Sequence, residues 1–122
     1  MVLALVVGLA GGTGAVARYL LDGTVQDRTS GLFPFGTLTV NVIGSFVLGV
    51  VAGVVLRHGW PGTFESIVGT GLCGGFTTWS TASWEIVRLV EEGEAGTAFR
   101  YTLANLGASL AAAGLGLLIV WF

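Results

Sequence analysis

The stretch that decides the fold is residues 69–85, GTGLCGGFTTWSTASWE. It lies within a mostly apolar run, but Gly74 and Gly75 are adjacent and Thr77 and Thr78 follow closely. Glycine destabilises a helix interior and threonine hydroxyls compete for backbone hydrogen bonds, so we expect a helix break between Gly74 and Thr78. A break inside a bilayer frees backbone groups that must be buried in protein or bind something, and freed carbonyls suit a monovalent cation. The alternative is a continuous helix whose glycines mark a close crossing point.

The composition excludes a water-soluble monomer and several classes of function. Of 122 residues, 53% are hydrophobic and 10% are charged, whereas a soluble domain has roughly 25% charged residues. The formal charge is -2 and every cation is an arginine, so no basic surface supports nucleic-acid binding. The single cysteine, Cys73, excludes an internal disulfide and a cysteine-based zinc site. No catalytic nucleophile, carboxylate pair or metal cluster stands out, so we do not expect an enzyme.

Four long apolar runs predict four membrane-spanning helices. A helix needs about 20 apolar residues to cross the hydrocarbon core of a bilayer, where its backbone groups must be paired internally. The runs cover approximately residues 2–21, 36–56, 64–90 and 98–122. The segments between them contain both prolines and most of the charged residues, as connections do. We therefore predict an all-α membrane protein in which residues 1–122 form one four-helix transmembrane domain with a broken third helix.

The arginines are distributed unequally between the two sides of such a bundle. Arg18, Arg28, Arg88 and Arg100 lie near the first and third connections, and Arg57 lies at the second. Positive residues concentrate on the cytoplasmic side of membrane proteins. The asymmetry therefore predicts that the first and third connections are cytoplasmic and that both termini are outside.

Two stripes of polar residues occur within the predicted spans at four-residue spacing. The stripes are Thr37, Asn41 and Ser45 in the second span and Tyr101, Asn105 and Ser109 in the fourth. Residues four apart stack on one face of a helix, so each stripe must face something polar in the membrane. One interpretation is hydrogen bonding between helices, and the other is a lining of donors along an ion path. The presence of two matching stripes favours the ion path.

Further polar residues follow the predicted break. Ser80, Thr81 and Glu85 continue its polar surface, with Trp79 beside them. Glu85 and Arg18 are ionisable groups within or near spans, where the first hypothesis is a functional site. An ion pair between these two residues, or snorkelling of their charged ends to the interface, is the structural alternative.

The glycine-rich segment GLAGGTGAVAR at residues 8–18 also invites comparison with nucleotide-binding loops. A dinucleotide-binding unit needs a second strand and a downstream acidic residue, neither of which has a counterpart here. A phosphate-binding Walker loop requires a lysine, and the chain has none. We therefore interpret these glycines as contacts between closely packed helices.

Three segments of the chain resemble the signature segments of the Fluc/CrcB fluoride channels. They are GGTGAVARY at 11–19, GTLTVNVIGSF at 36–46 and GLCGGFTTWSTASWE at 71–85. The resemblance implies small dual-topology dimers of the cell membrane, in which two subunits pack antiparallel and form two narrow fluoride pores. It also implies passive, selective export that relieves cytoplasmic fluoride toxicity.

The resemblance assigns roles to residues that match the family by position. Asn41 would be a pore-facing amide donor with Thr37 near it, and Arg18 would make the vestibule electropositive. The carbonyls of Gly74 and Thr77 would hold a structural sodium ion at the dimer centre. The polar track along the fluoride pathway would comprise Trp79, Ser80, Thr81 and Glu85 together with Tyr101, Asn105 and Ser109.

The chain departs from the family at two aromatic positions. The family run TTFSTF reads TTWSTA here, which places Trp79 and Ala82 where phenylalanines are expected. Trp79 retains an aromatic edge that can face an anion, whereas Ala82 has no ring. A heterodimer with a paralogue, with one or both pores non-conducting, is therefore an alternative to a conducting homodimer. A proton-coupled multidrug exporter is a further alternative, for which Glu85 is the only candidate acid.

Overall fold

The computed structural model describes residues 1–122, and all of its regular secondary structure is helical. The elements are α1 (Val2–Asp27), α2 (Phe35–His58), α3 (Gly62–Phe64), η1 (Glu65–Cys73), α4 (Gly74–Phe76), α5 (Ser80–Glu91) and α6 (Ala95–Trp121). The elements α3, η1 and α4 follow one another without a gap, and η1 has π-helical hydrogen bonding. The all-α prediction is therefore confirmed.

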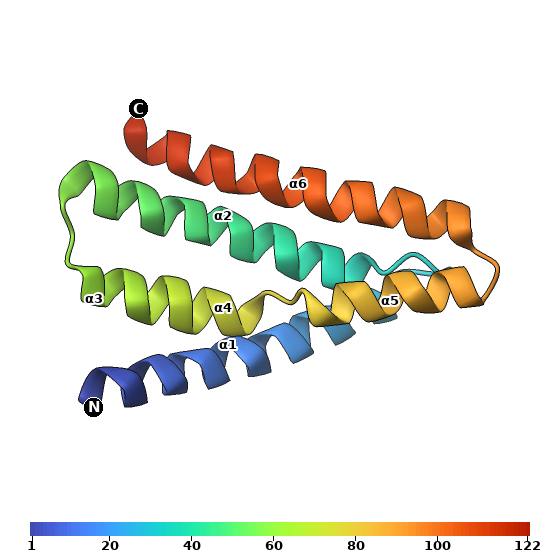
Figure 1. Cartoon of the computed structure of the whole chain (residues 1–122), viewed down its shortest axis with the longest axis horizontal. Coiled ribbons are helices and arrows are strands. Elements are labelled where there is room, and N and C mark those ends of the chain that lie inside the picture. Colours follow the sequence, from blue (N-terminus) through green and yellow to red (C-terminus); the bar gives the residue numbers. More distant parts are fainter.

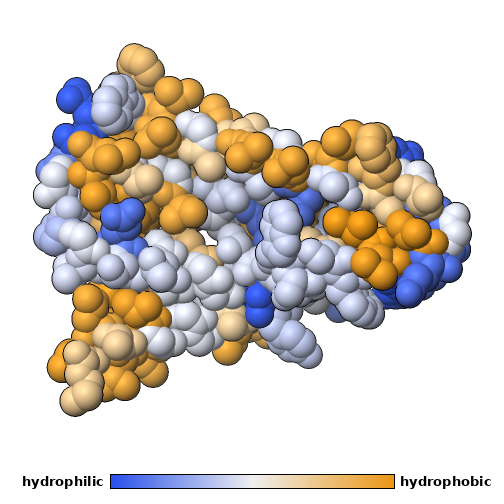
Figure 2. Space-filling view, viewed as in Figure 1, coloured by the Kyte–Doolittle hydropathy of each residue, from blue (hydrophilic) through white to orange (hydrophobic).

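The helices run up and down along the long axis of the molecule (Figure 1). Both termini and the α2–α3 connection lie at one end, and the α1–α2 and α5–α6 connections lie at the other. Three helices, α1, α2 and α6, are long and apolar enough to cross a membrane. Apolar residues cover much of the face in Figure 2, as expected for helices that contact lipid tails. These properties are those of a membrane protein.

Helical structure is interrupted within the third apolar run. It stops at Phe76, and Thr77 has the extended backbone angles φ -78° and ψ 160°. The helix resumes at Ser80. We call residues 77–79 the break segment. Its position coincides with the end of the Gly-Gly-Phe-Thr-Thr sequence from which a break was expected.

Glycines allow the backbones of neighbouring helices to approach closely. A Cβ atom added to Gly116 of α6 would contact the carbonyl oxygen of Phe46 on α2. A Cβ atom on Gly75 would contact the carbonyl oxygen of Gly11 on α1. The glycines of the GLAGGTGAVAR segment thus take part in helix packing, with α1 pressed against the element that precedes the break segment.

Two helices extend beyond their predicted ends. The first was expected to end at about Leu21 but continues to Asp27, and the fourth begins at Ala95 instead of residue 98. The sequence-based limits followed the first charged residues, which mark the edge of the apolar region. Charge does not terminate a helix, and the extension of α1 contains no proline, so the helix continues past this edge.

The glycine contacts lead to a test of helix packing. We expect Gly116→Ala to lower the stability of the protein by about 1–3 kcal/mol, because the added methyl group overlaps the α2 backbone. The matched control is Gly114→Ala on the same helix, where an added Cβ has nothing within 4 Å. Thermal unfolding in detergent, followed by size-exclusion chromatography, compares the two variants. Equal melting temperatures would contradict the proposed packing.

Candidate functional site

The side chain of Asn41 on α2 bridges the break segment. Its Oδ1 atom accepts a hydrogen bond of 2.8 Å from the Thr78 N–H, and its Nδ2 atom donates one of 2.9 Å to the Thr78 carbonyl. In a continuous helix the Thr78 N–H would donate to the Gly74 carbonyl. Both Asn41 and Thr78 are buried, where unpaired backbone groups are costly. The Asn41 amide therefore takes the place of missing helical hydrogen bonds.

Asn41 also connects the break segment to α6. Its Nδ2 atom donates a second hydrogen bond, of 3.1 Å, to Asn105 Oδ1. An amide nitrogen carries two hydrogens, so both donors of Asn41 are engaged within the chain. The polar stripes of α2 and α6 thus meet at this pair of amides.

The preceding residue, Thr77, contacts α1. Arg18 Nη1 donates a hydrogen bond of 3.3 Å to the Thr77 carbonyl. The Thr77 hydroxyl donates to the carbonyl of Cys73, one turn earlier. Arg18 does not pair with Glu85, so the ion pair considered from the sequence is not formed; the break leaves a backbone carbonyl closer to the guanidinium.

Glu85 on α5 instead joins the two polar stripes one turn away from the amide pair. Its Oε1 atom accepts a hydrogen bond of 2.9 Å from the Thr37 hydroxyl, and its Oε2 atom accepts one of 2.8 Å from the Tyr101 hydroxyl. Tyr101 is fully buried, and the Phe33 ring packs edge-on against it at 5.5 Å between ring centroids. The carboxylate is therefore held by two neutral donors from different helices.

A cavity of about 300 Å³ adjoins the break segment, and we call it the break cavity. It is lined by Asn41, Ser45 and Leu48 of α2, by Thr77, Thr78 and Trp79, by Ala82, Ser83 and Ile86 of α5, and by Thr102, Asn105, Leu106 and Ser109 of α6. The Ser109 hydroxyl oxygen is buried and has no hydrogen-bond partner in the chain. The cavity therefore combines an apolar wall with a few polar groups, one of which is unsatisfied.

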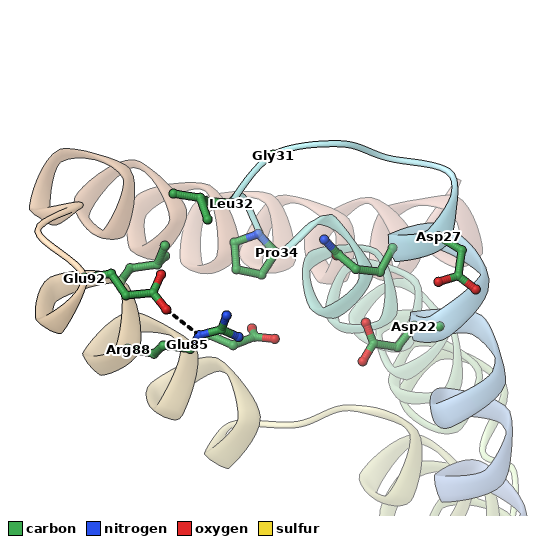
Figure 3. Close-up of a pocket in the computed structure, with 11 residues that line it drawn as sticks. Asp22, Asp27, Gly31, Leu32, Pro34, Glu85, Arg88 and Glu92 are labelled. Carbon is green, nitrogen blue, oxygen red and sulfur yellow. Dashed lines mark hydrogen bonds and ion pairs between the residues drawn. The ribbon is translucent and has the colours of Figure 1, made fainter.

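A second cavity, of about 420 Å³, lies beside the α1–α2 connection, and we call it the loop-end cavity. Asp22 and Asp27 reach it from α1, while Glu85, Arg88 and Glu92 reach it from α5 (Figure 3). The single guanidinium is paired with Glu92 at 2.9 Å. Carboxylates predominate in this cavity, so its charge does not favour an anion.

The structure brings together most, but not all, of the residues selected from the sequence. Trp79 is 82% exposed at the edge of the break cavity, and Ser80 is exposed. The N–H of Thr81 donates to the Thr78 hydroxyl, so Thr81 helps to start α5. Ala82, where the family pattern has a ring, is buried and leaves its side of the cavity unfilled.

The comparison with known families follows this geometry. A family model described as "CrcB-like protein, Camphor Resistance (CrcB)" matches residues 5–117. The chain belongs to the CrcB family. The resemblance read from three sequence segments is thereby confirmed over nearly the whole chain.

Several curated CrcB relatives carry the name of a fluoride-specific ion channel. FluC 1 of Leifsonia xyli subsp. xyli (strain CTCB07) is 49% identical over 113 residues, which cover 93% of this chain and 82% of the relative. FluC of Gloeothece citriformis (strain PCC 7424) is 36% identical over 116 residues, covering 95% of this chain and 94% of the relative. FluC 2 of Cutibacterium acnes (strain DSM 16379 / KPA171202) is 52% identical over 81 residues, or 66% of each chain.

Sequence reasoning missed some residues that shape this CrcB site. Thr78 was identified only as part of the break, although its backbone is the partner of Asn41. Ser83 and Thr102 were not selected, although both line the break cavity. The available signal was helical spacing, since Ser83 lies within one turn of Ser80 and Thr102 follows Tyr101. The acidic lining of the loop-end cavity was missed because its carboxylates are far apart in the sequence.

The bridge to Thr78 predicts that Asn41 stabilises this CrcB chain. We expect Asn41→Leu to lower the melting temperature in detergent, because it leaves both Thr78 backbone groups unpaired, at about 1–3 kcal/mol for each group. The control is Thr39→Val on the same helix, whose hydroxyl bonds only to the Phe35 carbonyl one turn earlier. If both variants melt at the temperature of the unsubstituted protein, the bridge does not support the break.

Proposed function

We propose that this CrcB chain is a subunit of a passive, fluoride-selective channel that exports fluoride from the cytoplasm and lowers its toxicity. The break cavity carries this proposal, because it places amide and hydroxyl groups beside an interrupted helix. The proposal is supported by relatives named as fluoride-specific ion channels that match 93% and 95% of the chain. Those names describe channels, in agreement with the sequence-based prediction that the chain is not an enzyme.

The chemistry of fluoride matches the polar groups of the break cavity. Fluoride is a small and strongly hydrated anion, so a selective pore must replace its water with hydrogen-bond donors. Amide N–H and hydroxyl groups supply such donors without a fixed positive charge, and they leave the anion free to move on. We place the anion in the break cavity and not in the loop-end cavity, where carboxylates predominate.

The two cavities are arranged in series along α2 and α5. Glu85 lines the loop-end cavity, whereas Ala82 and Ile86, its neighbours on α5, line the break cavity. The hydrogen bonds from Thr37 and Tyr101 to Glu85 lie between them. We propose that an ion passing from one cavity to the other must displace or cross this contact, so that Glu85 controls the narrowest part of the pathway.

We also propose that the interrupted segment, residues 62–91, is a fourth membrane crossing. It runs alongside α1 and α2 between the two ends of the molecule (Figure 1). With four crossings, the arginine asymmetry places the α1–α2 and α5–α6 connections in the cytoplasm. The location we propose is the cell membrane.

The open side of the break cavity supports a dimer. Trp79 is 82% exposed at its rim, and Leu48 and Leu106 are also exposed there. Lipid tails cannot satisfy the amide and hydroxyl groups inside such a cavity. A second subunit packed over the opening would separate these groups from lipid. We therefore propose an antiparallel dual-topology dimer, formed with another copy of this chain or with a paralogue.

The resemblance further suggests a structural sodium ion at the centre of this dimer, held by the carbonyls of Gly74 and Thr77. The chemistry of the Gly74 carbonyl fits, because it lacks the hydrogen bond that Thr78 N–H would give it in a continuous helix. The Thr77 carbonyl already accepts a hydrogen bond from Arg18, whose charge opposes a cation at the same oxygen. Two carbonyls do not complete the coordination shell of a hard cation, so the site requires a second subunit.

The proposed activity predicts selective efflux from liposomes. We expect vesicles loaded with potassium fluoride and containing the purified protein to release fluoride when valinomycin balances the charge. The same vesicles loaded with potassium chloride should retain chloride. An ion-selective electrode measures both, and protein-free vesicles are the control. Lack of fluoride release by the chain, both alone and with a paralogue, would overturn the proposal.

The proposed dimer predicts the mass of the purified protein. We expect light scattering after size-exclusion chromatography in detergent to give a protein mass twice that of the 12.5 kDa chain, either alone or after co-expression with a paralogue. A monomeric mass in both preparations, at all protein concentrations tested, would contradict the dimer.

A further inference from the structure

The backbone of the break segment determines the orientation of the Asn41 side chain. The Thr78 N–H can only donate and the Thr78 carbonyl can only accept, so Asn41 must present Oδ1 to the first and Nδ2 to the second. Reversing the amide would place two donors and two acceptors against each other. The position of the oxygen and nitrogen atoms of Asn41 is therefore set by the backbone.

The orientation of Asn41 in turn determines that of Asn105. The second hydrogen on Asn41 Nδ2 points to Asn105, which must offer its Oδ1 atom as the acceptor. Asn105 lines the break cavity, and its Nδ2 atom makes no hydrogen bond within the chain. Both hydrogens of that nitrogen remain available as donors to a molecule in the cavity.

Other polar groups around the break cavity are already engaged. The hydroxyls of Thr77 and Thr102 donate to backbone carbonyls one turn earlier, at 2.9 Å and 2.8 Å. The Thr78 hydroxyl is hydrogen-bonded to Thr81. Ser109 differs, because its hydroxyl oxygen is buried and unpartnered although it lies one turn from Asn105 on α6. A buried polar group without a partner is costly unless a ligand satisfies it.

We propose that Asn105 Nδ2, together with the Ser109 hydroxyl, donates hydrogen bonds to the anion in the break cavity, and that Asn41 is a positioning residue that orients Asn105. The inference rests on the proposed fluoride channel and names its specificity-determining donors. It differs from the role expected for Asn41 from the family resemblance, since both Asn41 donors are bound to Thr78 and Asn105.

Three substitutions at one position test this inference. Asn105→Ala removes the donor and should reduce fluoride efflux from liposomes about tenfold to a hundredfold, as expected for a lost hydrogen bond to a charged group. Asn105→Ser restores a donor and should retain efflux within about threefold of the unsubstituted protein. Asn105→Asp still accepts from Asn41 but presents an oxygen to the cavity, so it should have the lowest efflux of the three.

Two further measurements separate a donor role from a structural one. Melting temperatures in detergent show whether efflux follows stability, and Thr39→Val, outside the cavity, is the control with unchanged efflux. The inference is overturned if Asn105→Ala and Asn105→Asp conduct within twofold of the unsubstituted protein. It is also overturned if alanine and serine reduce efflux and melting temperature equally. Absence of efflux from the unsubstituted protein instead overturns the proposed function itself.

Discussion

The arrangement of this molecule depends on how the unpaired backbone of Thr78 is satisfied. An interrupted helix in a membrane has no water with which to pair its free amide and carbonyl groups. Asn41 supplies both an acceptor and a donor from a neighbouring helix, so α2 must lie beside the break segment at a fixed register. The packing of α2 with α6 then brings Asn105 and Ser109 to the same place.

This dependence links local structure to chemistry in one direction. The glycines and threonines of residues 74–78 interrupt the helix, the interruption orients one amide, and that amide orients the next. A channel for a small anion needs donors whose direction is set before the ion arrives, because reorienting them during passage would slow it. Here the direction originates in the backbone, which cannot rotate as a hydroxyl does.

Much of the fold followed from the sequence, while the partners within the site did not. The lengths of the apolar runs predicted the number and order of the helical segments, and the Gly-Gly-Phe-Thr-Thr sequence indicated where helical structure stops. Four-residue spacing correctly placed Thr37 and Tyr101 on surfaces that meet, at Glu85. The pairing of Asn41 with Thr78 could not be predicted, because it joins residues 37 positions apart and depends on helix register. The end of α1 was placed too early because hydropathy reports the membrane edge and not the helix terminus.

The acidic lining of the loop-end cavity has an electrical consequence. Asp22, Asp27, Glu85 and Glu92 gather at one end of the molecule, with Arg88 as the only cation facing them. A conduit with such a mouth at one end alone would rectify, passing anions more readily in one direction than in the other. Two copies arranged head to tail would cancel this polarity, so their combined current would depend equally on voltage of either sign.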